Sequence, residues 1–110
     1  MKGANLGELE ELVLLTTASL VSEAYSVSIC DELEKRTGRN PRLGMVHAVL
    51  NRLEEKGLVK SKLGDATSER GGKRKRFYTL TSAGKSALVK AREIREELWS
   101  AIPPLVLRKI

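Results

Sequence analysis

The stretch that decides the fold reads GMVHAVLNRLEEKG over residues 44–57. Successive residues of an α-helix turn by about 100°, which places the apolar side chains of this stretch on one face. These side chains are Val46, Val49, Leu50 and Leu53. The opposite face lacks bulk at first and then becomes polar, with Gly44, His47, Ala48, Asn51 and Arg52. The pattern predicts an amphipathic helix whose outer face a large partner can approach closely.

The residues after this helix predict a β-hairpin. Gly57 can end the helix in the left-handed conformation that glycine favours. Residues 58–63 and 74–80 read as strands, and the polar loop between them contains glycines. We expect this loop, residues 64–73, to be mobile in the absence of a ligand because it is too polar to bury. A helix followed directly by a basic hairpin is typical of a recognition helix with a wing beside it.

Charge is distributed unevenly along the chain. The 110 residues carry a formal net charge of +6. Residues 1–34 contain one lysine against seven acidic residues, a net charge of −6, so the remaining residues carry +12. Positive charge is therefore concentrated where the predicted recognition helix and hairpin lie, which favours a polyanionic partner. A chain of this length forms one domain with a modest core.

Two helices are expected before the recognition helix. The first runs from a cap at Asn5 to about Leu20 and is apolar nearly all round. Such a helix must be covered on more than one side, and in so small a chain a partner subunit could supply the second cover. The second helix has Tyr25 or Ser26 as its cap and ends before Gly38.

The sequence allows two positions for the start of the recognition helix. Asn40 as the cap with Pro41 in the first helical position is favourable chemistry. A start at Arg42 or Leu43 also fits the apolar pattern. In either case Arg39 and Arg42 gather at this end of the helix, where bound phosphates would also meet free backbone N–H groups.

The last predicted helix runs from about Ser82 to Ser100, with Thr81 as its cap. One face carries a narrow apolar stripe, flanked by two larger side chains. The stripe consists of Ala83, Ala87, Ala91, Ile94, Leu98 and Ile102, with Leu88 and Trp99 beside it. It could lie along the domain itself, but little core remains for it to cover. We therefore favour a contact with a second subunit.

Several classes of function are disfavoured by what the sequence lacks. A single cysteine, Cys30, cannot form an internal disulfide, and a packed small hydrophobe is favoured over a redox-sensing thiol there. One histidine and one cysteine cannot supply the roughly four ligands of a closed metal site. No catalytic grouping or phosphate-binding glycine loop is present, so we expect neither an enzyme nor a cofactor. Without a signal peptide or a membrane-length apolar run, we expect a cytoplasmic protein.

Four blocks of the sequence match, in order, the pattern of a known family. They are Leu6–Glu10 with the leucines that follow, Ala24–Val27, Gly44–Val59 and Arg74–Lys85. Together they resemble the first helix, the entry to the second helix, the recognition helix and the wing's return strand of the PadR-like winged-helix transcriptional regulators. The resemblance spans residues 6 to about 100, and the single C-terminal helix is similar to that of the shorter members. His47 stands where the family usually has tyrosine.

The resemblance implies a mainly α fold with a small β-hairpin wing, an α+β winged helix-turn-helix. The DNA-binding part would comprise residues 1–81, and residues 82–110 would form a dimerisation helix and a short tail, all in one compact unit. The resemblance also implies a homodimer in which the C-terminal helix reaches the partner's first helix. Repression would follow from occupation of operator DNA, which two-fold symmetry requires to be roughly palindromic.

The candidate contacts to double-stranded DNA divide into base readers and phosphate contacts. Asn51 can form paired hydrogen bonds to adenine, and Arg52 can contact guanine or phosphate. The basic run of the wing is expected on phosphates. Glu54 and Glu55 are expected to point away from DNA, since a carboxylate facing phosphates would weaken binding. The full set is Arg42, Gly44, Met45, His47, Ala48, Asn51, Arg52, Lys73, Arg74, Lys75 and Arg76.

The candidate subunit contact combines the first and last helices. Its residues are Leu9, Val13, Ala87, Leu88, Ala91, Ile94, Leu98 and Trp99. Trp99 has a second reading, as the wall of a pocket for a small aromatic effector at the dimer interface. The alternative to DNA binding is a winged-helix protein-interaction module whose basic surface binds acidic protein partners.

Overall fold

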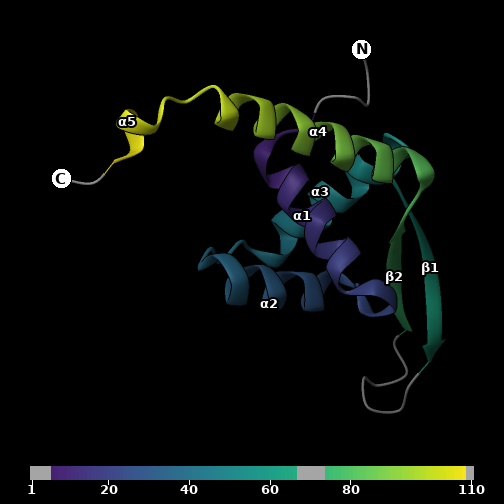
Figure 1. The fold of residues 1–110 in the computed structure, drawn as a ribbon. Coiled ribbons are helices and arrows are strands. Elements are labelled where there is room, and N and C mark those ends of the chain that lie inside the picture. Colours follow the sequence, from purple (N-terminus) through teal and green to yellow (C-terminus); the bar gives the residue numbers. More distant parts are fainter. Residues whose placement is uncertain (1–5, 67–73, 109–110) are drawn as a thin grey trace.

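The computed structural model of the chain describes residues 6–66 and 74–108. Its elements are α1 (Glu8–Ser19), the short 3-10 helix η1 (Val21–Glu23), α2 (Ser26–Thr37), α3 (Leu43–Glu55), β1 (Val59–Ala66), β2 (Arg74–Leu80), α4 (Ser82–Ser100) and α5 (Pro104–Leu107). Helices α1, α2 and α3 form the body, the antiparallel hairpin of β1 and β2 lies at one side of it, and α4 crosses over α1 (Figure 1). The predicted class, mainly α with one small hairpin, is confirmed.

The core lies where α1, α2 and α3 meet the base of the hairpin. The predicted apolar face of α3 is fully buried there: Val46, Val49, Leu50 and Leu53. The residues packed with it from the other elements are Val13, Leu14, Ala24, Ile29, Leu33, Leu58, Val59 and Tyr78. Burying one such large apolar side chain stabilises the folded state by about 1.5–3 kcal/mol. The orientation of α3 is therefore fixed by its inner face, which leaves its outer face available.

Most helix ends follow their local sequence signals. α2 ends before Gly38, whose φ of 78° is the left-handed conformation expected of a glycine cap. α3 begins at Leu43 with Arg42 as its N-cap, so the later of the two predicted starts is the one adopted. α4 has its predicted range, and Oγ1 of Thr81 accepts a 3.0 Å hydrogen bond from the N–H of Gly84.

The ends of the chain differ from expectation. α1 has Gly7 as its N-cap, and the N–H of Gly7 donates a 2.9 Å hydrogen bond to Oε1 of Glu10, which reaches back from the first turn. The predicted cap, Asn5, lies outside the described residues. The sequence did not predict η1 or α5. Pro104 occupies the first turn of α5, where a missing N–H costs no helical hydrogen bond.

The hairpin is longer than predicted. Its strands pair from Val59 opposite Leu80, and the register is irregular between Leu63 and Ala66. β1 thus continues past its predicted end at Leu63, with an irregularity that a local sequence pattern does not reveal. Residues 67–73, on which most of the predicted mobile loop and Lys73 fall, lie outside the described residues.

Tyr25 anchors the hairpin to the start of α2. Its ring meets that of Phe77 edge to face with the centroids 5.6 Å apart, and Nζ of Lys75 lies 4.3 Å from the centroid of the Tyr25 ring. Phe77 in turn covers Gly64, where a β carbon would lie 2.6 Å from Cε2 of Phe77. Because aromatic pairs and cation–π contacts depend on orientation, this stack holds β2 at a defined angle to the helices.

α4 contacts the body along its length as far as Arg95. Ala87 and Leu88 are half-buried against the core. The guanidinium of Arg95 donates hydrogen bonds of 2.7 and 3.0 Å to the carboxylate of Glu11 on α1. Beyond this bidentate pair, the end of α4 and the segment with α5 extend past the body (Figure 1).

In the described part of the chain, no helix is both long and apolar enough to cross a membrane.

Candidate nucleic-acid interface

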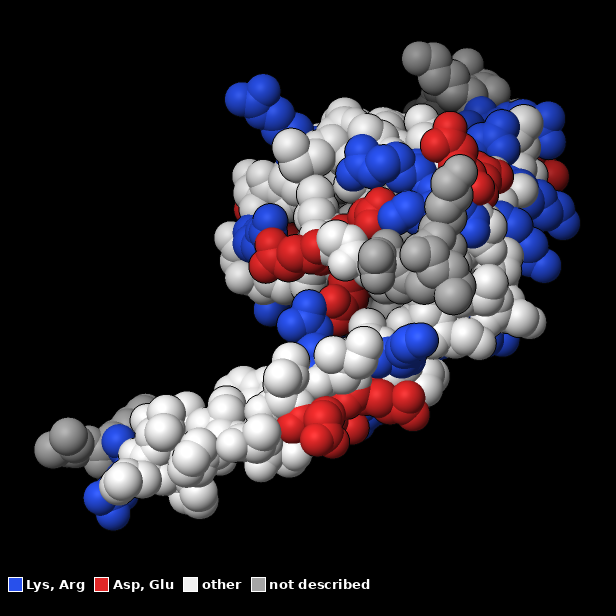
Figure 2. Space-filling view, turned by 90° about the horizontal axis from the view of Figure 1, so that it is seen from above, with Lys and Arg blue, Asp and Glu red and all other residues white. Residues whose placement is uncertain are grey.

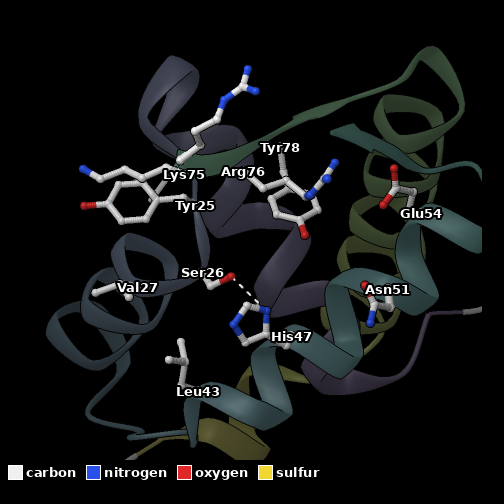
Figure 3. Close-up of a pocket in the computed structure, with 11 residues that line it drawn as sticks. Tyr25, Ser26, Val27, Leu43, His47, Asn51, Glu54, Lys75, Arg76 and Tyr78 are labelled. Carbon is white, nitrogen blue, oxygen red and sulfur yellow. Dashed lines mark hydrogen bonds between the residues drawn. The ribbon is translucent and has the colours of Figure 1, made fainter. Parts of the chain in front are cut away.

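A hollow of about 590 Å³ lies between α3, the start of α2 and strand β2. Figure 3 shows the side chains that line it, with those of α3 on one side and those of β2 on the other. The lining residues are Tyr25, Ser26, Val27, Leu43, His47, Asn51, Glu54, Arg74, Lys75, Arg76 and Tyr78. The fold thus brings predicted DNA contacts from α3 and from the wing to one place. These shared residues are His47, Asn51, Arg74, Lys75 and Arg76.

Two polar side chains of α3, those of His47 and Asn51, line the hollow one helical turn apart. His47 is turned towards Ser26 at the start of α2, with Nδ1 of the ring 3.2 Å from Oγ of Ser26 (Figure 3). Asn51 lies one turn further along α3 and is exposed, with its amide available to a partner. A flexible amide and an oriented imidazole are both groups that recognise hydrogen-bonding edges.

The cations of β2 are held in place by contacts with β1 and with Tyr25. Nε of Arg74 donates a 2.7 Å hydrogen bond to the carbonyl oxygen of Gly64, and Nη1 of Arg76 donates a 3.0 Å hydrogen bond to Oγ of Ser61. Both arginines remain exposed. Lys75 lies over the ring of Tyr25. These contacts limit the motion of each side chain, so a bound anion would meet charges that are already ordered.

Glu54 corrects one sequence-based expectation. It is expected to point away from DNA, but it lines the hollow beside Tyr78, together with the predicted contacts His47 and Asn51. The cause is a contact with β1, which folds back beside the end of α3: Oγ of Ser61 donates a 2.8 Å hydrogen bond to Oε2 of Glu54. Burial raises the pKa of Tyr78, and the negative charge of Glu54 raises it further. Since Ser61 also accepts from Arg76, a polar chain links α3 to the wing.

The N-terminal half of α3 forms the open part of this surface. Arg42, Gly44, Met45 and Ala48 are all exposed. A β carbon on Gly44 would meet no atom within 4 Å. The outer face of this helix is therefore as bare as its sequence indicates, and a partner could approach the backbone closely.

Arg52 is a predicted DNA contact whose side chain reaches α1. It does not line the hollow, and its Nε is 3.4 Å from Oε2 of Glu10 on α1. Nζ of Lys56 lies 2.9 and 3.0 Å from the two oxygens of the same carboxylate. Burial by itself would raise the pKa of Glu10, but the hydrogen bonds from Lys56 and Gly7 and the nearby positive charges outweigh it, so the pKa is lowered. Glu10 thus ties the end of α3 to α1.

The residues predicted to form the subunit contact differ in their exposure: some are buried within the single chain and others remain exposed. Val13 is fully buried in the core of the single chain, so its assignment to a subunit contact is wrong. Leu9, Ala87 and Leu88 are half-buried against the same core, and Ala91 is half-buried. The large side chains near the end of α4 remain open: Ile94 is 53% exposed, Leu98 64% and Trp99 62%. Figure 2 shows this projecting end as a mainly uncharged surface, while Lys and Arg gather towards the hairpin end of the body.

Cys30 is half-buried on α2. Burial raises the pKa of its thiol, and the neighbouring Asp31 raises it further, so the reactive thiolate is disfavoured. This environment agrees with the interpretation of Cys30 as a packed small hydrophobe. Among residues 6–66 and 74–108, no group of three His, Cys, Asp or Glu side chains is arranged to hold a metal ion.

A three-helix body with a basic hairpin beside its third helix defines a winged-helix protein. Residues 13–90 match the Transcriptional regulator PadR-like family. The chain belongs to this family, which confirms the resemblance seen in the sequence and makes it a DNA-binding transcriptional regulator by class.

Relatives agree with this placement. An uncharacterised protein from Lysinibacillus sphaericus is 33% identical over 84 residues, which cover 74% of this chain and 72% of the relative. The structure of a PadR-like transcription factor from Bacteroides fragilis matches with a TM-score of 0.73 and 24% identity, over 84% of each chain. A PadR family transcription regulator from Clostridium difficile matches with a TM-score of 0.64 and 26% identity, over 86% of this chain and 88% of that one.

Proposed function

We propose that this chain is a homodimeric transcriptional repressor that acts in the cytoplasm and binds a palindromic operator. Residues 1–81 contact the DNA, and residues 82–110 contact the partner subunit as part of the same compact unit. The observation that carries the proposal is the hollow in which polar side chains of α3 face the ordered cations of β2. Repression is the mode of regulation that the family resemblance implies.

In this proposal α3 lies in the major groove, and its N-terminal half, which carries small exposed residues, is inserted most deeply. Gly44 and Ala48 leave room for the base edges, and Met45 supplies an apolar contact to a thymine methyl group. Asn51 offers an amide that can pair with adenine. The arginines of β2 contact the phosphates next to the groove and so set the register of the protein on the duplex.

The subunit contact is proposed between the projecting end of α4 and α1 of the partner. Leu98 and Trp99 are large apolar side chains that this chain does not bury, and Leu15 on α1 is 46% exposed. Apolar surfaces of this kind are commonly covered by a second copy. Trp99 at such a contact could also form one wall of a site for a small aromatic effector.

Selection of duplexes from a random pool by the purified chain tests the proposal. We expect enrichment of a palindrome whose half-site centres lie about 34 Å apart, or a multiple of that distance. Sedimentation of the selected complex should show two chains on each duplex. Recovery of no palindrome, together with binding to acidic proteins, would overturn the proposal in favour of a protein-interaction module.

A further inference from the structure

Ser26 and His47 connect the first residue of α2 to the middle of α3. Oγ of Ser26 is 3.2 Å from Nδ1 of His47, across a sequence separation of 21 residues. Both residues line the hollow. Within residues 6–66 and 74–108 neither side chain forms another hydrogen bond, so each orients the other.

The contact bears on which ring nitrogen of His47 carries the proton. A neutral imidazole has one N–H donor and one acceptor nitrogen, and the partner of one nitrogen decides the role of the other. The hydroxyl of Ser26 is a donor with no other acceptor in the described part of the chain. If it donates to Nδ1, the ring proton lies on Nε2, and His47 presents an N–H donor to whatever occupies the hollow.

We propose that Ser26 is a positioning residue that fixes His47 as a hydrogen-bond donor to DNA. This inference rests on the proposed function, because it places DNA against the hollow. The acceptor is a phosphate oxygen or N7 of a guanine, both of which accept a hydrogen bond from an Nε2–H. Glu54, the carboxylate of the hollow, is engaged by Ser61 and does not compete for the ring. The exposed Arg74 and Arg76 attract the anionic backbone of the duplex to the same place.

The proton position can be measured without DNA. His47 is the single histidine of the chain, so nitrogen–proton correlation spectra of its ring need no assignment. At alkaline pH we expect the Nε2–H form in the wild-type protein and a mixture of both neutral forms in Ser26→Ala. A wild-type ring that is mainly in the Nδ1–H form would overturn the inference.

A double-mutant cycle tests the role in binding. On the duplex recovered by selection, Ser26→Ala should weaken binding by about three- to tenfold, the effect of one lost orienting hydrogen bond. Ser26→Thr keeps the hydroxyl and should bind as the wild type does. In a His47→Ala background, Ser26→Ala should have no further effect. Ser86→Ala, an exposed serine on α4, is the matched control.

Modified duplexes identify the acceptor. Methylphosphonate linkages introduced one at a time remove the charge and one non-bridging oxygen of a single phosphate, and single 7-deazaguanine substitutions remove the N7 acceptor of one guanine. One of these changes should weaken the wild type but leave His47→Ala unaffected. A Ser26→Ala effect that persists without His47, or DNA binding that is normal in Ser26→Ala, would overturn this inference but not the proposed function. Failure of the wild type to bind any duplex would overturn the proposed function as well.

Discussion

Gly84 lies against the carbonyl oxygen of Leu58, so closely that a β carbon at position 84 would be 2.1 Å from that oxygen. The same carbonyl accepts a 3.1 Å hydrogen bond from the N–H of Thr81, which restrains it from moving away. This contact fixes the point at which α4 leaves the hairpin. The direction of α4, and with it the place of its projecting end, therefore depends on a glycine at this position.

Replacing Gly84 with alanine should destabilise the protein. The new methyl group would have to displace backbone atoms, and we expect a loss of about 1–3 kcal/mol in the free energy of unfolding. Urea unfolding followed by circular dichroism measures it. Gly44→Ala is the matched control, because a β carbon there meets nothing and alanine favours the helix by about 0.5–1 kcal/mol. An equal loss in both variants would show that the contact with Leu58 does not matter.

Replacing Glu10 with glutamine should weaken the link between α1 and the end of α3. The variant loses the charge that Lys56 and Arg52 contact, and we expect a cost of about 1–3 kcal/mol at neutral pH. Glu8→Gln is the control, because the side chain of Glu8 is 74% exposed and its pair with Arg39 lies at the surface. Surface pairs contribute little, so that variant should unfold nearly as the wild type does.

The lowered pKa of Glu10 adds a pH dependence to the same comparison. A carboxyl group whose pKa is lower in the folded state stabilises the fold above its unfolded pKa, here about 4.5. That contribution is lost as the pH falls through the folded pKa. The difference in stability between the wild type and Glu10→Gln should therefore be constant above about pH 5.5 and narrow below about 4.5. A difference that does not change with pH would mean that the charge of Glu10 has no role.

Features that depend on neighbouring residues could be predicted from the sequence. The repeat of apolar residues in α3 identifies its inner face because helical periodicity relates positions three and four apart. Thr81 could be recognised as a cap because its hydroxyl needs only the first turn of its own helix. The same reasoning placed α3 beside a basic hairpin, and the fold brings His47 and Asn51 to the wing cations.

Contacts between distant segments could not be predicted in this way. Nothing near Glu10 in the sequence indicates that Lys56 and Arg52 will approach it, so the sequence pattern assigns Arg52 to DNA alone. The local sequence pattern also does not predict the hydrogen bond from Ser61 to Glu54, which holds Glu54 at the hollow. Val13 was assigned to a subunit contact because a helix that is apolar all round does not show which side its own core will cover.

Replacing Leu98 with glutamate should disrupt the proposed dimer. A charge in an apolar contact must be desolvated without a partner, so the variant should sediment as a monomer. Val89→Glu is the control, since Val89 is 57% exposed on the same helix but, nine residues away, lies on the opposite face. That variant should remain dimeric. A dimer that survives Leu98→Glu would show that the end of α4 is not the subunit contact.

Substitutions in the recognition helix and in the wing should change DNA binding in different ways. Asn51→Ala removes an amide that reads base edges, so it should lower affinity for the selected palindrome far more than for random DNA. Arg74→Ala with Arg76→Ala removes two phosphate contacts, so it should weaken binding to all duplexes. The slope of log affinity against log salt concentration should become less steep by about two. Anisotropy titrations at several salt concentrations measure both effects. Lys85→Ala with Lys90→Ala removes the same charge from α4 and should leave the salt dependence unchanged. If the α3 and wing variants responded alike, the division between base reading and phosphate contact would be wrong.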